Sequence, residues 1–292
     1  MNEFKTYHPI VNFTYFLCVI GFSMFLMHPV SLVISLFSAI AYLTVLKGRK
    51  AAFKRLLAVI PMLMCAAVIN PLFNHEGVTV LGYLPSGNPL TAEAFFYGCG
   101  AAVMLACVIY HFSCYNEVMT SDKFVYLFGK LIPVLSMVVS MVLRFVPKLT
   151  KRLREIINAQ KCIGRDIKKG RLWQRMKLAV KILSILVTWS LESSVETADS
   201  MKNRGYGLSG RTAYSIFHFD KRDLAALIWI LATSLSVIAG KVCGFLYYRY
   251  FPSFKMEWMS DGAVLTQIAY LLLCVTPIFI EVRENYRWKS TK

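Results

Sequence analysis

The sequence predicts an all-α protein that crosses a membrane several times and carries a basic cytoplasmic region of amphipathic helices. Three observations lead to this fold class. Of the 292 residues, 57% are hydrophobic and only 17% are charged, a mixture too apolar for an ordinary soluble domain. The apolar residues gather in runs as long as a bilayer requires. Most of the formal net charge of +17 falls in one segment between these runs.

A hydrocarbon core about 30 Å thick needs roughly 20 mostly apolar residues per helix. About six runs meet this requirement, and we expect each to form a transmembrane helix. They cover residues 10–27, 30–46, 53–69, 92–112, 224–248 and 263–280. Two other apolar stretches, residues 131–143 and 176–191, are short or interrupted by Lys177 and Lys181. These two are predicted to be amphipathic helices that lie against a surface.

The runs divide the chain into three parts. Residues 1–114 hold the first four expected transmembrane helices, residues 115–221 form the cytoplasmic region, and residues 222–292 hold two further transmembrane helices and a tail. Basic residues beside membrane spans stay on the cytoplasmic side. Residues 47–55 contain five Lys and Arg residues, whereas residues 70–90 contain none. We therefore expect a multi-pass protein of the cell membrane with both termini in the cytoplasm.

The segment from Arg144 to Lys181 contains thirteen cations and two anions. Such a segment suits the anionic head groups of a lipid bilayer or an acidic protein partner. Nucleic acid is not an expected partner, since no recognised nucleic-acid fold or aromatic platform accompanies the charge. The eight cysteines and five histidines are scattered, so neither a metal site nor a disulfide framework is expected.

The glycines at 205, 207 and 210 have the G-x-G-x-x-G spacing of a dinucleotide-binding loop. In such a loop the glycines follow a strand and open a helix. Here the preceding residues predict a helix that ends at about Arg204, which makes Gly205 a helix stop with positive φ. Because no P-loop pattern occurs either, we expect no nucleotide or other cofactor on this chain.

The stretch ADSMKNRGYG, residues 198–207, closely resembles the second coupling motif of the transmembrane T component of energy-coupling factor (ECF) transporters. This superfamily includes the membrane subunits of cobalt and nickel uptake systems. NAQKCIGRD, residues 158–166, lies where the first coupling motif is expected. The family usually has Arg before that glycine, where this chain has Ile163, so Arg165 or Lys161 would supply the charge. The resemblance implies that these residues dock onto ATPases: Ala159, Gln160, Lys161, Gly164, Arg165, Ala198, Met201, Arg204 and Gly205.

Proteins of this family join two ATP-binding ATPase subunits to a separate substrate-binding membrane subunit, the S component, for vitamin or transition-metal uptake. The resemblance thus implies a scaffold that couples ATP hydrolysis to substrate release and is not itself an enzyme. Two alternatives remain. A conventional permease subunit of an ATP-driven importer would carry the substrate through its own pore and use a single short coupling helix. A polytopic membrane enzyme would need paired acids, His or Ser-Lys groups within its spans.

Overall fold

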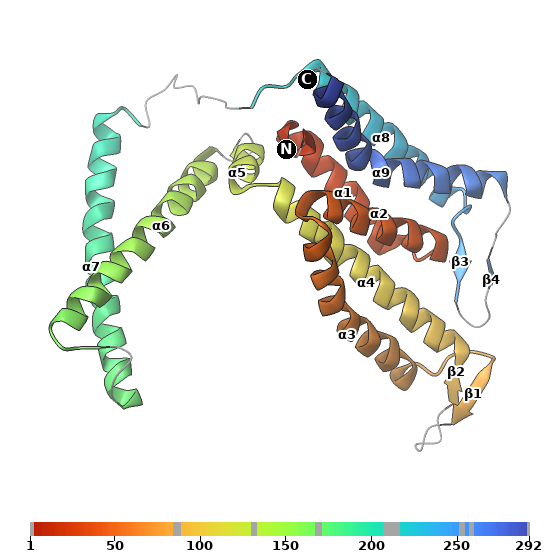
Figure 1. Cartoon of the computed structure of the whole chain (residues 1–292), viewed down its shortest axis with the longest axis horizontal. Coiled ribbons are helices and arrows are strands. Elements are labelled where there is room, and N and C mark those ends of the chain that lie inside the picture. The colour runs from red at the N-terminus through yellow and green to blue at the C-terminus, as the bar shows by residue number, and fades with distance from the viewer. Residues whose placement is uncertain are drawn as a thin grey trace. The chain divides into compact units, whose positions relative to one another are not determined.

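The computed structural model of the chain describes residues 3–83, 89–129, 133–166, 171–206, 217–250, 255–256 and 260–290. The chain forms two compact units, of which the first combines Met1–Thr120 with Phe217–Lys292 and the second is Ser121–Ile216. Figure 1 shows both units as predominantly helical, in agreement with the predicted fold class. The division of the chain after residues 114 and 221 into membrane and cytoplasmic parts stays a prediction.

The first unit is a bundle in which the N-terminal helices pack with the two C-terminal ones. Its elements are η1 (Glu3–Thr6), α1 (Pro9–Phe25), α2 (Pro29–Lys47), α3 (Arg49–Phe73), α4 (Ala92–Val118), α8 (Lys221–Val242) and α9 (Asp261–Ser290). Helix α4 packs against α1, α2 and α3, and α9 packs against α2 and α8. A proline begins both α1 and α2, where its missing N–H costs nothing and its fixed φ suits the helix.

The N-terminal η1 closes one end of this bundle by burying an aromatic ring. Phe4 is fully buried, and its ring lies edge-on to those of Tyr15, Phe16 and Tyr42. Edge-to-face contacts of this kind add to the free energy gained from burying the rings themselves. The Tyr15 hydroxyl donates a hydrogen bond of 3.2 Å to the backbone oxygen of Cys274 in α9. The aromatic cluster therefore ties η1, α1, α2 and α9 together.

Two buried carboxylates hold the N-terminal segment against the C-terminal helices. Asp223, near the start of α8, accepts a hydrogen bond of 3.1 Å from the backbone N–H of His8 and another of 3.1 Å from that of Asp220. Glu281 in α9 accepts one of 3.4 Å from the backbone N–H of Phe4. Both carboxylates are almost fully buried, so each satisfies a backbone donor that water does not reach.

Two short hairpins, which the hydrophobic pattern did not predict, lie at helix connections of the first unit. Strand β1 (Val80–Tyr83) pairs with β2 (Pro89–Thr91), and β3 (Tyr248–Arg249) pairs with β4 (Lys255–Met256), both antiparallel. Just after β3, the Tyr250 hydroxyl donates a hydrogen bond of 3.0 Å to the backbone oxygen of Met27. This bond attaches the second hairpin to the connection between α1 and α2.

Six helices in the described part of the chain are long and apolar enough to cross a membrane, namely α2, α3, α4, α7 (Leu172–Asn203), α8 and α9. The chain is thus a polytopic membrane protein, as predicted. The set of helices differs from the prediction in two places. Helix α1, which was expected to span, has 17 residues and is shorter than these six. Helix α7, which was expected not to span, qualifies by length and composition.

The connection between α2 and α3 is shorter than the sequence suggested. The helices end and begin at Lys47 and Arg49, with only Gly48 between them at φ +83°. The basic residues predicted to form a loop therefore occupy the end of α2 and the first two turns of α3. Lys47 forms an ion pair of 2.8 Å with Glu117 near the end of α4, which fixes the ends of α2 and α4 to one another.

The second unit consists of α5 (Ser121–Gly129), α6 (Pro133–Cys162) and α7. Helix α5 packs against α6, and α6 packs against α7. Figure 1 shows α6 and α7 as two long helices that cross at an angle, with their C-terminal ends apart from one another. Residues 131–132, where the first amphipathic stretch was predicted to begin, lie outside the described residues.

Candidate functional site

Helix α7 ends in a Schellman motif built around Gly205. The glycine adopts φ +73°, a conformation that is costly for residues with a Cβ atom. Its N–H donates to the oxygen of Lys202 at 3.0 Å, and the N–H of Tyr206 donates to the oxygen of Met201 at 3.1 Å. These two bonds define the motif and satisfy backbone oxygens that the helix end would leave free. The predicted helix stop thus has the geometry expected of it.

Helix α6 ends in the same motif, built around Gly164. This glycine adopts φ +80°, its N–H donates to Lys161 at 3.0 Å, and the N–H of Arg165 donates to Gln160 at 3.0 Å. The two helix ends therefore align residue by residue. The alignment pairs Lys161 with Lys202, Ile163 with Arg204, Gly164 with Gly205, and Arg165 with Tyr206. Helix α8 also stops at a glycine in this way, at Gly244, so the backbone motif alone does not define a function.

The residues predicted to dock onto partners are largely accessible. The side chains of Lys161, Arg165 and Arg204 are exposed, and Arg204 forms no ion pair with any residue that the structure describes. Gln160 differs, because it is only 9% exposed and its Oε1 accepts no hydrogen bond within the described ranges. Gln160 thus faces the interior of its unit. The other predicted docking residues are exposed or partly exposed: Ala159, Gly164, Ala198, Met201 and Gly205.

The two ends are separate surfaces. Figure 1 shows the C-terminal ends of α6 and α7 at different places in the second unit, so they do not form one pocket. Gly207 and Gly210, the other glycines of the G-x-G-x-x-G spacing, lie outside the described residues. Within the described ranges, no group of three or more His, Cys, Asp or Glu side chains is placed to hold a metal ion.

The crossing of α6 and α7 is centred on Trp189, which the sequence did not single out. Phe145 of α6 stacks on its ring, with the ring centroids 6.2 Å apart and the planes 5° from parallel. Lys148 Nζ lies 5.1 Å and Arg152 Cζ 5.4 Å from the centroid of the indole, within the range of cation–π attraction. Lys148 also donates a hydrogen bond of 3.0 Å to the hydroxyl of Ser193.

Helical spacing explains how these residues meet. Phe145, Lys148 and Arg152 are separated by three and four residues and so share one face of α6, while Trp189 and Ser193 are four apart on α7. This spacing is visible in the sequence, although the partner face is not. We name these five residues the crossing cluster.

The crossing cluster bears on whether α7 spans the bilayer. Trp189 lies near the middle of α7, so a spanning α7 would place the cations of Lys148 and Arg152 near the bilayer centre. Charged side chains at that depth cost about 2.5–3.5 kcal/mol each even on the lowest scales. The most apolar 18-residue stretch of α7 has a mean hydropathy of 1.5, which is also the lowest value among the six candidate spans. These observations favour the interpretation of α7 as an amphipathic helix that lies on a surface.

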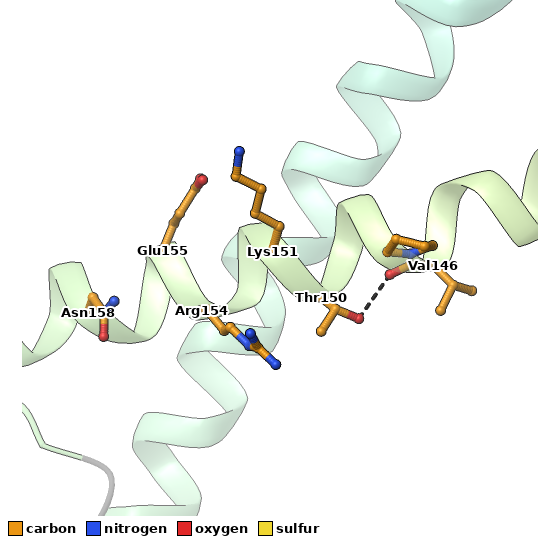
Figure 2. Close-up of a pocket in the computed structure, with 7 residues that line it drawn as sticks. Val146, Thr150, Lys151, Arg154, Glu155 and Asn158 are labelled. Atoms are coloured by element: carbon orange, nitrogen blue, oxygen red, sulfur yellow. Dashed lines mark hydrogen bonds between the residues drawn. The ribbon is translucent and has the colours of Figure 1, made fainter.

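A hollow runs along α6 next to the crossing cluster, and Figure 2 shows the residues around it. All of them belong to α6: Val146, Pro147, Thr150, Lys151, Arg154, Glu155 and Asn158. Lys151 and Glu155 extend from one side of the helix, whereas Thr150 donates a hydrogen bond of 2.9 Å back to the oxygen of Val146. A hollow lined by one helix does not enclose a small molecule, and we assign it no ligand.

The fold and the two helix ends define a polytopic membrane protein that presents paired, glycine-terminated basic helices. No model of a known protein family matches the chain. The chain is similar to several proteins named energy-coupling factor transporter transmembrane protein EcfT. It is 36% identical to the protein of Bacillus selenitireducens over 111 residues, and this aligned stretch covers 38% of this chain and 41% of that protein. It is 39% identical to EcfT 1 of Listeria monocytogenes over 106 residues, and this stretch covers 36% of this chain and 40% of that protein.

A third relative, the EcfT of Lactobacillus helveticus, is 38% identical over 98 residues, or 33% of this chain and 35% of that protein. The chain therefore spans about two fifths of the length of these relatives. These similarities agree with the resemblance of residues 198–207 to the T component of ECF transporters.

Proposed function

We propose that this chain is the transmembrane scaffold subunit of an ECF-type importer, where it couples ATP hydrolysis by partner subunits to substrate release from a separate membrane subunit. The main support for the proposal is that the ends of α6 and α7 combine one backbone geometry with an exposed arginine beside the glycine, Arg165 in α6 and Arg204 in α7. Two equivalent ends on one chain suit a dimer of ATPases, with one end for each subunit. The similarity to EcfT proteins supports the same conclusion.

The α7 end has the chemistry of a docking contact. Arg204 precedes the glycine at the cap of the helix and is exposed. A guanidinium presents several donors in a plane and pairs with a carboxylate through two parallel hydrogen bonds. Gly205 lacks a side chain and so leaves room for a partner backbone to approach. We infer that Arg204 pairs with an acidic residue in the groove of an ATP-binding subunit.

Force transmission requires that the two helices move as one body. The crossing cluster joins α6 to α7 by a ring stack, two cation–π contacts and a hydrogen bond. In this proposal the ATPases close on ATP binding and displace the two helix ends. The crossing passes this displacement to the substrate-binding subunit, which binds a vitamin or a transition metal. The chain contributes no catalytic group, because its partners hydrolyse ATP.

We infer that both termini and the second unit lie on the cytoplasmic side. The end of α2 and the start of α3 carry the basic residues at positions 47–55, whereas residues 70–90 contain no Lys or Arg. The ion pair of Lys47 with Glu117 brings the end of α4 to the same side as the end of α2. The positive-inside rule then assigns that side to the cytoplasm.

Co-purification from the native membrane tests the proposal. Tagged wild-type protein is extracted in detergent, and the proteins that elute with it are identified by mass spectrometry. We expect ATP-binding subunits to elute with the wild type and to be depleted in Arg204→Glu. Arg171→Glu is the matched control, since Arg171 is an exposed arginine at the opposite end of α7. The absence of ATP-binding subunits from the wild-type eluate would refute the proposal.

A further inference from the structure

The ends of α6 and α7 present similar side chains in a different order around the glycine. In α7 a cation, Arg204, precedes the glycine and an aromatic residue, Tyr206, follows it. In α6 an apolar residue, Ile163, precedes the glycine and a cation, Arg165, follows it. Because the backbone hydrogen bonds of the two motifs match, the difference lies in the side chains and not in the path of the chain.

Ile163 is not needed to build the helix end. It is 68% exposed, which is a large exposure for an isoleucine. The hydrophobic contact that often accompanies a Schellman motif joins the residue after the glycine to the last turn of the helix. Those positions are occupied here by Arg165 and Gln160, so Ile163 takes no part in such a contact.

The sequence left open whether Lys161 or Arg165 replaces the missing arginine. Helix α7 has both Lys202 and Arg204, and Lys202 aligns with Lys161. Lys161 is therefore the equivalent of Lys202 and does not replace the arginine. Arg165 carries the additional charge, but on the far side of the glycine. A carboxylate placed to meet Arg204 in one groove would face Ile163 in the other.

We propose that the α6 end docks by inserting Ile163 into an apolar pocket of its ATP-binding partner while Arg165 pairs with a carboxylate beyond that pocket. At the α7 end the order of the two contacts is reversed: Arg204, before the glycine, pairs with the carboxylate, and Tyr206, after the glycine, makes the second contact. Ile163 is then the residue that determines which groove the α6 end fits. The inference rests on the proposed function and adds that the two grooves differ in chemistry.

The test measures how much of each ATP-binding subunit stays with the purified complex. Ile163→Arg, which copies the order found in α7, is compared with Ile163→Leu, which keeps an apolar side chain of similar volume. Loss of a buried isoleucine contact together with burial of a charge corresponds to at least about a tenfold loss of affinity. We expect Ile163→Arg to deplete one ATP-binding subunit by about that factor, and Ile163→Leu to retain it. Arg165→Glu should deplete the same subunit.

Other outcomes separate this inference from the proposed function. If ATP-binding subunits elute with the wild type and Ile163→Arg retains both of them, the inference is overturned while the proposed function stands. If Ile163→Arg weakens only the binding of the protein to vesicles of phosphatidylglycerol and phosphatidylethanolamine, Ile163 inserts into lipid and the inference is wrong. If no ATP-binding subunit elutes with the wild type, both fail. Size-exclusion elution at the wild-type position shows that a variant is folded, as expected for an exposed position.

Discussion

Replacing Trp189 by alanine should loosen the crossing of α6 and α7 without unfolding the first unit. The substitution removes the stack on Phe145 and the contacts with Lys148 and Arg152. An aromatic pair in this geometry contributes about 0.5–1.5 kcal/mol, and each cation–π contact at a partly exposed site about 0.5–1 kcal/mol. The three contacts add to about 1.5–3.5 kcal/mol, or roughly a tenfold to few-hundredfold change in the local opening equilibrium.

Hydrogen exchange followed by mass spectrometry measures this effect directly, since amides in a locally opened segment exchange faster. We expect faster exchange in peptides from the central turns of α6 and α7 and unchanged exchange in α4. Trp173→Ala is the matched control, because Trp173 lies in the first turn of α7 and is 76% exposed. Equal exchange in the two alanine variants would show that the crossing cluster does not hold the helices together. Trp189→Phe should give an intermediate result, since indole is the better cation–π partner.

Three further predictions follow from single residues. Gly205→Ala puts a Cβ atom at φ +73°, which costs about 1–2 kcal/mol and should speed hydrogen exchange in the last turn of α7. Gly21→Ala is the control, because open space surrounds Gly21 and the helix around it should keep its exchange rate. Equally faster local exchange in both variants would contradict backbone strain at position 205. Burial lowers the pKa of His28 below 6.5, so its contribution to stability is present above pH 6.5 and is lost as the pH falls through the lowered pKa. The melting temperature should thus decline toward pH 5 in the wild type and less in His28→Asn, and parallel curves would refute this. Asp223→Ala removes the carboxylate that accepts from the buried N–H of His8, which costs about 1–3 kcal/mol and should lower the melting temperature by several degrees. An unchanged melting temperature would contradict the anchoring of the N-terminal segment.

The helix stops were predictable from sequence because they depend on local chemistry. A glycine after a run of helix-forming residues adopts the positive φ that other residues avoid, and Gly164 and Gly205 do so. The transmembrane helices were predictable because each run of apolar residues is set by the thickness of the bilayer. The docking residues were proposed from the resemblance of two short segments to known coupling motifs, and their role stays a prediction.

The crossing cluster was not predictable, because a contact between Lys148 and Trp189 depends on how two helices cross and not on either helix alone. The role of α7 shows a second limit. Its composition satisfies the requirements for a membrane span, whereas Lys177 and Lys181 in its sequence and the two cations packed on Trp189 favour a surface position. The hairpin that contains β1 and β2 was missed because its strands are too short to show an alternating pattern.

Photo-crosslinking from the α7 end tests whether this helix docks onto an ATP-binding subunit. A benzophenone amino acid replaces Tyr206, which follows the helix stop and is 41% exposed, and the protein is irradiated in its native membrane. Tyr83, which is 75% exposed in β1 and lies in the segment assigned to the opposite side of the membrane, is the matched control position. We predict a crosslink to an ATP-binding subunit from position 206 and none from position 83. A crosslink to such a subunit from position 83 alone, or only lipid adducts at position 206, would contradict the assignment of α7 as a helix that docks onto an ATPase.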